Sequence, residues 1–171
     1  MPAAEPRGTH MLPRSYATTV PPEWVDYNGH MNVAYYMVAF DRGTDGLLDR
    51  LGLGVDYRRA TDRTIYVLEA HLLYERELRE GDALAVTTQL LDADAKRLHV
   101  FHSMWHGATG ERVATNELLC LHIDLHGSET GGPRAARFAP EEQARIDALL
   151  AEHRALEPPP EAGRRIALRR S

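Results

Sequence analysis

The chain has 171 residues, 43% of them hydrophobic, which is enough for one domain with a substantial core. Its net charge of -5 gives no basic footprint for nucleic acid, and its one cysteine, Cys120, excludes an intrachain disulfide. A single cysteine favours a reducing compartment, so a cytoplasmic protein is expected. No run of about 18 apolar residues is present, so no membrane span is predicted.

The two ends of the chain differ in composition from the middle. Residues 1–13 mix proline, alanine and glycine without periodicity, and a disordered leader is expected there. Residues 157–171 contain three consecutive prolines and four arginines, which predicts a flexible basic tail. The folded domain is therefore expected to span residues 14–156. Its first strand is predicted at residues 15–20, because this β-prone run is followed by two prolines.

A polar loop, Asp-Tyr-Asn-Gly-His-Met-Asn at 26–32, leads into a predicted helix. Asn32 is a good N-cap and Gly52 a good stop. Apolar residues between them recur at helical spacing and predict one buried face, formed by Val33, Tyr36, Met37, Phe40, Thr44, Leu47, Leu48 and Leu51. Gly43 and Gly46 each cost this helix about 1 kcal/mol relative to alanine. Close approach of two backbones would justify that cost, so the helix is expected to lie tightly on a sheet.

Four runs with period-two alternation follow a charged connection at 56–63. They cover residues 64–75, 83–91, 97–106 and 112–124, and the short turns between them predict an antiparallel meander. Residues 126–137 are predicted to form a loop, and a second helix begins at Pro140.

These elements predict an α+β fold, in which one long helix packs against a five-stranded antiparallel sheet. The later strands have apolar residues on both faces, so a second covering, and hence an oligomer joined through edge strands, is expected.

Asp26 is the strongest candidate for a catalytic carboxylate, although turn formation alone is the commoner role of Asp in such loops. It precedes a helix N-terminus, whose free N–H groups at Asn32, Val33 and Ala34 can hold an anion or a developing oxyanion. Asn32 is more often a cap than a catalytic residue and can serve as both. His30 is either a hydrogen-bonding spacer or an acid–base group.

Other polar and aromatic residues offer weaker signals. Gly29 would let the backbone approach a ligand closely. Glu69 interrupts an apolar strand, and such a charge usually faces solvent, or else a pocket or a subunit interface. Trp24 and Tyr27 lie outside the helix, are free to line a pocket and would suit a cationic substrate group.

No cofactor is predicted from the motifs of the chain. Three histidines, His99, His102 and His106, lie close together but lack a fourth ligand, so no metal site is expected. No glycine-rich phosphate loop follows a strand, which argues against a nucleotide cofactor.

The segment 24–36 resembles the Asp-x-x-Gly-His-x-Asn segment of hotdog-fold acyl-CoA thioesterases of the 4-hydroxybenzoyl-CoA thioesterase type. The similarity extends over about residues 15–126 and includes Tyr74 followed by the Gly81-Asp82 turn. More narrowly, the segments 24–41, 68–71 and 89–99 resemble the betainyl-CoA thioesterases of carnitine catabolism, including those fused to some carnitine dehydrogenases.

This resemblance implies a hotdog fold, a homodimer or homotetramer whose sheets join at edge strands, and active sites at the subunit interface. It implies that Asp26 is the catalytic carboxylate, acting as nucleophile or as general base, and that the amide near Val33 polarises the thioester carbonyl. His30 and Asn32 complete the implied catalytic set. The implied substrate-binding set, in which Glu69 is a counter-charge for a betainyl group, is Trp24, Tyr27, Gly29, Val33, Tyr36 and Glu69.

The implied partner is an acyl-CoA, and coenzyme A enters only as part of that substrate. Two alternatives remain, namely a non-catalytic acyl-CoA-binding module and a hydratase or dehydratase on the same fold. The acyl group, the choice between dimer and tetramer, and the arginines that meet the coenzyme A phosphates are left open.

Overall fold

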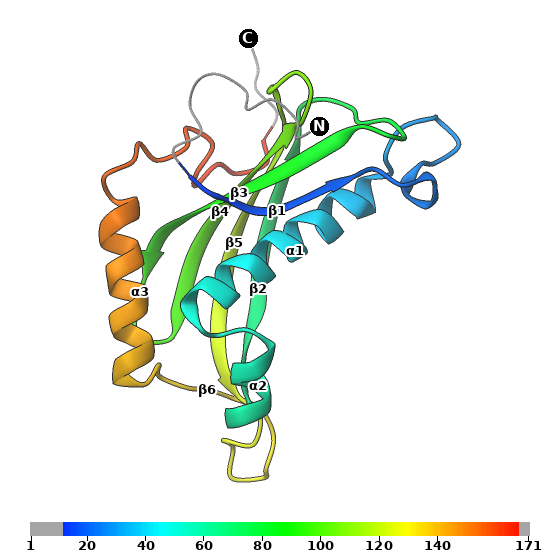
Figure 1. Cartoon of the computed structure of the whole chain (residues 1–171). Helices are drawn as coiled ribbons and strands as arrows, with labels where there is room; N and C mark the ends of the chain where they lie inside the picture. Colours follow the sequence, from blue (N-terminus) through cyan, green and yellow to red (C-terminus); the bar gives the residue numbers. More distant parts are fainter. Residues whose placement is uncertain (1–11, 168–171) are drawn as a thin grey trace.

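One curved antiparallel sheet carries the fold, and the long helix α1 (Val33–Leu51) lies across one of its faces (Figure 1). The computed structural model describes residues 12–167, so most of the predicted leader lies outside the described residues. The strands are β1 (Arg14–Thr19), β2 (Arg63–Tyr74), β3 (Ala83–Ala93), β4 (Arg97–His106), β5 (Arg112–Asp124) and β6 (Arg134–Ala135). The other helices are α2 (Val55–Thr61), α3 (Pro140–His153) and a 3-10 turn at Pro22–Trp24.

The strands are ordered β1-β3-β4-β5-β2, with β6 added beside β5. The meander is confirmed for β3, β4 and β5, but the prediction is wrong for β2, which pairs with β5 instead of β3. The reason is that β1 already occupies the free side of β3, with Thr18 opposite Leu84. β2 therefore forms the far edge of the sheet.

Helix α1 begins and ends where its capping residues predict. The Asn32 side chain accepts a hydrogen bond from Ala34 N, and Gly52 adopts the left-handed conformation, with φ of 67°. The buried face differs in part from the prediction, because it includes Ala39 and Gly43 while Val33 is 60% exposed. Val33 lies in the first turn, beside the cavity described below, and not over the sheet core.

The expected close approach of α1 to the sheet is confirmed at its two internal glycines. A Cβ atom on Gly46 would lie 2.2 Å from the backbone oxygen of Ser15 in β1. A Cβ atom on Gly43 would lie 2.7 Å from Cγ1 of Val86 in β3. The contacts of α1 with β1 and β3 therefore require glycine at position 46 and leave almost no room for a side chain at position 43.

Buried histidines connect elements that are distant in sequence. His102 in β4 is fully buried and lies 3.0 Å from Thr44 Oγ1 of α1 and 2.8 Å from Thr88 Oγ1 of β3. Burial lowers the pKa of His102 to about 3, so its ring is neutral. His153 in α3 accepts a hydrogen bond from Leu90 N at 2.9 Å, at a part of β3 that extends beyond β1. Helix α3 thus protects an otherwise open strand edge.

Two short elements were not predicted. Helix α2 occupies most of the expected charged connection, and none of its residues is buried. Strand β6 lies within the expected loop at 126–137 and pairs Ala135 with Ile123. Tyr57 of α2 donates to or accepts from His122 at 2.7 Å, which fastens α2 to β5.

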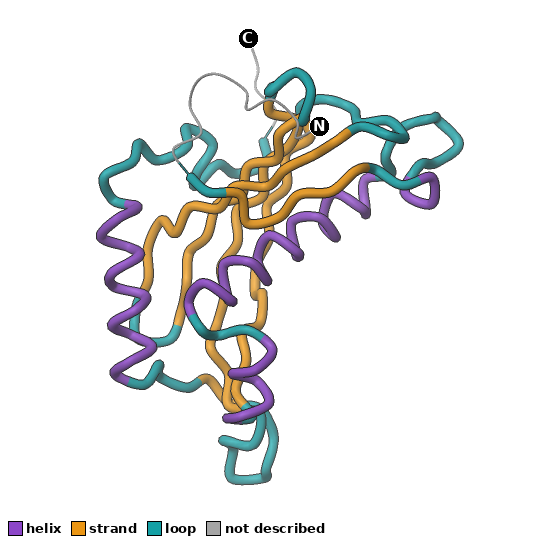
Figure 2. Tube along the Cα trace, viewed as in Figure 1, coloured by secondary structure: helices purple, strands orange, loops and turns teal. Residues whose placement is uncertain are grey.

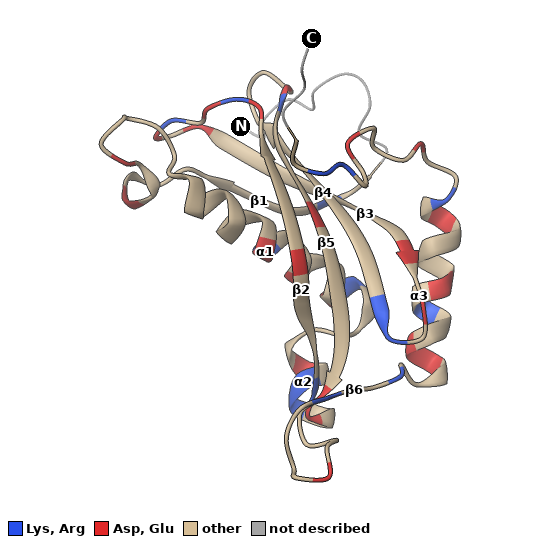
Figure 3. Ribbon diagram, turned by 180° about the vertical axis from the view of Figure 1, so that it is seen from behind, with Lys and Arg blue, Asp and Glu red and all other residues tan. Residues whose placement is uncertain are grey.

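The segment after α3 runs back to the strands as a loop (Figure 2) and crosses the face of the sheet opposite α1, which Figure 3 shows. Arg112 of β5 joins Glu75 at 2.7 Å and Glu161 at 2.5 Å. Both carboxylate oxygens of Glu117 accept from Gly163 N at 2.9 Å. Residues 157–167 are therefore attached to the sheet, and they supply part of the second covering that we had expected from another subunit. The flexibility of the tail stays a prediction.

Candidate active site

The polar loop before α1 is a tight turn closed by backbone hydrogen bonds. Val25 and Met31 form an isolated antiparallel bridge, and Asp26 N donates to His30 O at 3.0 Å. Gly29 N donates to Asp26 O at 2.9 Å, and Gly29 has φ of 79°. The glycine therefore serves the turn itself, since few other residues adopt this conformation without strain.

This turn presents the carboxylate of Asp26 at the start of α1. Asn28 N donates to Oδ1 of Asp26 at 2.8 Å, and Asn32 Nδ2 donates to Oδ2 at 3.3 Å. The other side-chain atom of Asn32, Oδ1, accepts from Ala34 N at 3.0 Å. Asn32 thus caps the helix, as predicted, and also orients the half-buried Asp26 carboxylate.

The free donors at the helix start are fewer than expected. Asn32 N donates to Trp24 O at 2.8 Å, and Ala34 N is used by the cap. Val33 N has no acceptor within the described part of the chain, so it is the predicted donor that remains available to an oxyanion.

A cavity of about 620 Å³ opens beside Asp26. Loop 26–31, the first turn of α1, and the end of β2 with the residues after it form its walls. Its lining residues are Asp26, Asn28, His30, Met31, Val33, Tyr36, Tyr74, Glu75, Arg76 and Glu77. Asp26, His30, Val33 and Tyr36 are therefore brought together as the sequence-based site requires.

The wall at 74–77 was missed by the sequence analysis. Tyr74 OH donates to Val33 O at 3.3 Å, and its ring meets that of Tyr36 edge to face at 5.3 Å. His30 Nε2 lies 3.0 Å from Glu77 Oε2, which places a carboxylate beside the imidazole. Met31 N donates to Leu78 O at 2.7 Å and holds this segment in place. No local sequence pattern predicts that residues 74–77 line the site, because a contact between distant parts of the chain brings them to the loop.

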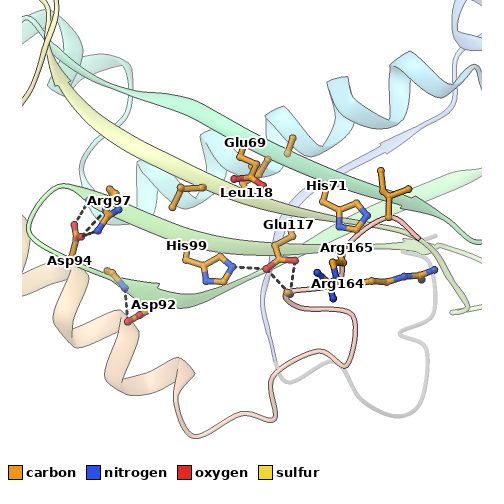
Figure 4. A pocket seen from close by; sticks show the side chains of 15 residues that line it. Glu69, His71, Asp92, Asp94, Arg97, His99, Glu117, Leu118, Arg164 and Arg165 are labelled. Carbon is orange, nitrogen blue, oxygen red and sulfur yellow. Dashed lines mark hydrogen bonds and ion pairs between the residues drawn. The ribbon is translucent and has the colours of Figure 1, made fainter. Parts of the chain in front are cut away.

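The remaining predicted substrate-binding residues do not converge on Asp26 within one protomer. Trp24 stacks on Tyr35, with ring centroids 5.3 Å apart, and Tyr27 is 97% exposed. Glu69 lines a separate groove on the opposite face of the sheet (Figure 4). The aromatic rings that do line the Asp26 cavity are those of Tyr36 and Tyr74.

Other reactive groups are outside this cavity. Burial raises the pKa of the Cys120 thiol to about 12, so this cysteine is an unreactive core residue. Among residues 12–167, no three His, Cys, Asp or Glu side chains are grouped so as to hold a metal ion. No described helix is both long and apolar enough to cross a membrane.

The cavity is therefore lined both by Asp26, whose carboxylate accepts two hydrogen bonds, and by Val33, whose N–H has no acceptor among the described residues. The family model of the thioesterase-like superfamily matches residues 20–165, and the chain belongs to this family. Its fold is the hotdog fold, and it is a thioester hydrolase.

Its relatives are more particular. The chain is 42% identical to a betainyl-CoA thioesterase of Pseudomonas aeruginosa, over 90% of this chain and 94% of the relative. It is 38% identical to an L-carnitine dehydrogenase/betainyl-CoA thioesterase of a Rhizobium species, over 90% of this chain but 30% of that longer protein.

Solved structures agree with the fold. A putative thioesterase from Pseudomonas putida KT2440 is 34% identical, with a TM-score of 0.78 over 94% of this chain and 99% of that chain. A hypothetical protein from Staphylococcus aureus, solved in complex with CoA, is 28% identical, with a TM-score of 0.82 over 95% of this chain and 99% of that chain.

Proposed function

We propose that the protein hydrolyses an acyl-CoA thioester to a carboxylic acid and free coenzyme A, and that betainyl-CoA is its substrate. The observation that carries this proposal is that one cavity is lined by Asp26 and by Val33, whose N–H is unpaired within residues 12–167. The identity to a betainyl-CoA thioesterase along nearly the full length of both chains supports the choice of acyl group.

Val33 N would donate to the thioester oxygen and stabilise the negative charge that develops there. Asp26 has two routes to cleavage. As nucleophile, a carboxylate oxygen adds to the carbonyl carbon, the C–S bond breaks with release of the thiolate, and water then hydrolyses the mixed anhydride. As general base, Asp26 takes a proton from a water that attacks the carbonyl, and that proton passes to the leaving thiolate.

The betainyl group carries a quaternary ammonium, which cannot donate a hydrogen bond and is recognised by aromatic faces and negative charge. The Asp26 cavity is lined by Tyr36 and Tyr74 and by Glu75 and Glu77, whose carboxylates also pair with Arg112 and His30. Burial raises the pKa of both tyrosines, which keeps them as neutral phenols. These groups support recognition of a cationic acyl chain.

Thiol release from a panel of acyl-CoA thioesters that includes betainyl-CoA tests the function. We expect the highest kcat/KM with betainyl-CoA and a loss of at least about 100-fold in Asp26→Asn, because either route needs the carboxylate. Asp45→Asn is the matched control, since Asp45 is an exposed residue of α1 and the charge change is the same. A folded Asp26→Asn protein with the wild-type rate would refute the assignment, and binding without turnover would favour the acyl-CoA-binding module.

The free edge of β2 supports a homodimer in which two such strands pair. Tyr66, Val67 and Leu68 are 43%, 47% and 55% exposed, and no described strand pairs with this edge. An apolar, unpaired edge of this kind is a template for pairing with a strand of another chain. Leu68→Lys is expected to shift the mass measured by light scattering toward the monomer, whereas Val55→Lys, at an exposed residue of α2, should not. An unchanged dimer mass in Leu68→Lys would exclude this edge as the interface.

A further inference from the structure

A second groove, of about 690 Å³, lies on the sheet face opposite α1, and we call it the outer groove (Figure 4). Strands β2 to β5 form its floor, and the C-terminal segment forms one wall. Its lining residues are Glu69, Ala70, His71, Asp92, Ala93, Asp94, Arg97, His99, Glu117, Leu118, Leu119, Gly163, Arg164, Arg165 and Ile166.

The wall formed by the C-terminal segment is fixed to the sheet at two points. Gly163 N donates to both oxygens of Glu117 at 2.9 Å, and Glu161 pairs with Arg112 at 2.5 Å. Arg112 in turn holds Glu75, so the segment is tied to β5 and, through Arg112, to the residue that follows β2. The two residues that follow Gly163 therefore extend from an anchored backbone and not from a free tail.

Most charges in the outer groove are paired within the described residues, and the exceptions are Glu69, Arg164 and Arg165. Glu117 binds His99 at 2.6 Å, Asp94 binds Arg97 at 2.6 Å, and Asp92 lies 3.7 Å from Arg154. Within the described residues, neither the Arg164 nor the Arg165 guanidinium makes a hydrogen bond or an ion pair, although the positive charge of Arg164 acts at longer range on Glu161 and helps to lower the pKa of that carboxyl. Figure 4 shows Arg165 beside His71. Two adjacent guanidiniums and an imidazole are thus left to meet a ligand.

We propose that Arg164 and Arg165, with His71, bind a phosphate group in the outer groove, and that this phosphate belongs to the nucleotide part of the coenzyme A substrate. Guanidinium groups match the geometry and charge of phosphate oxygens. A phosphate bound by Arg164 and Arg165 would leave the ion pairs of Glu117, Asp94 and Asp92 intact. The assignment of coenzyme A as the source rests on the proposed function.

The two sites are linked through a third depression and an ion pair. The Asp26 cavity includes Glu75 and Arg76, and these two residues also line a shallower depression that contains Arg112. Arg112 pairs with Glu161, two residues before the start of the groove wall at Gly163. A long flexible arm attached to the thioester could therefore follow the end of β2 from one face of the sheet to the other.

Steady-state kinetics with two substrates provides the test. We expect the Arg164→Ala/Arg165→Ala double variant to raise KM for the acyl-CoA about tenfold with kcat unchanged, since it loses exposed charge-assisted contacts. The same acyl group on pantetheine, which carries no nucleotide, should show no change. Arg134→Ala is the matched control, because Arg134 is an exposed arginine outside the groove. Equal changes for both substrates, or none for either, would overturn the proposal.

Calorimetric titration with the product coenzyme A gives a readout that does not depend on turnover. The double variant should bind coenzyme A about tenfold more weakly and lose most of its salt dependence. Glu69→Gln should change affinity in the opposite direction, because Glu69 is the carboxylate of the groove without a partner in the described structure. If the double variant bound ATP more weakly than the wild type but bound coenzyme A equally well, coenzyme A would be refuted as the source of the phosphate. Wild-type binding of coenzyme A without hydrolysis of any thioester would refute the proposed function alone.

Discussion

The double role of Asn32 can be separated by one substitution, Asn32→Asp. The new side chain keeps an oxygen that can accept from Ala34 N, so the helix cap is retained. It replaces the amide that donates to Asp26 with a second carboxylate oxygen at the same position, 3.3 Å from Asp26 Oδ2. A favourable contact to the candidate catalytic carboxylate thus becomes a repulsion, with little change in shape.

The size of the effect follows from that distance. Two unit charges 3.3 Å apart repel by about 1.3 kcal/mol in water and by about 5 kcal/mol at an effective dielectric constant of about 20. Both side chains are partly exposed, so about 1 to 2.5 kcal/mol is the relevant range, which corresponds to about one to two pH units. Repulsion favours the protonated pair, so the acid limb of the rate profile should move to higher pH by this amount.

The assay is kcat/KM for thiol release between about pH 4 and 9, together with thermal unfolding. The melting temperature should stay near the wild-type value because the cap remains. Asn28→Asp is the matched control, since Asn28 reaches Asp26 through its backbone N–H and the same charge is added in the same loop. An acid limb in Asn32→Asp that coincides with the wild-type limb would refute the idea that Asn32 orients the ionised Asp26.

Two further predictions concern stability. Gly46→Ala should lower the free energy of unfolding by about 2 kcal/mol in denaturant titrations, because the new Cβ atom would meet the backbone oxygen of Ser15. Arg42→Ala, on the exposed face of α1, is the control and should leave the free energy of unfolding unchanged. Equal stability of the two variants would contradict the close approach of α1 to β1. Burial lowers the pKa of His102 from 6.5 to about 3, so the unfolded chain binds an extra proton at this residue between these values, and His102 alone should lower stability by about 2 kcal/mol from pH 7 to 5. Burial also lowers the pKa of His122 and His153, which add to the slope in the same direction. His102→Gln should flatten this slope and His126→Gln, at an exposed histidine, should not; a slope unchanged in His102→Gln would assign the proton to another group.

Features with local causes could be predicted from the sequence, whereas those with distant partners could not. The ends of α1 were predicted correctly because Asn32 and Gly52 act on the backbone beside them. The predicted position of β2 in the sheet was wrong, because the alternation of apolar residues indicates which residues share a face but not which strand is the neighbour of β2. Helix α2 was missed because it has no buried residue, so no periodic apolar signal marks it.

The same distinction holds at the candidate site. Asp26 and Asn32 are close in sequence, and their contact follows from a short turn before a helix. Tyr74 and Glu77 reach the cavity only because the chain after β2 returns to this turn through the hydrogen bond between Met31 and Leu78. The composition and spacing of the residues around Asp26 therefore could not predict that the chain after β2 contacts this turn.

The edge position of β2 also bears on the order in which the sheet assembles. β2 is synthesised before β3 and β4, yet among the described strands it pairs with β5 alone, so Tyr74 must wait for Ala114 and Arg63 for Asp124. The β3-β4-β5 meander closes through neighbouring turns and has the lower entropic cost, so it should form first, with β2 docking last. Until β2 docks on β5, both edges of this apolar strand are unpaired. We expect the nascent chain to be most prone to aggregation during this interval.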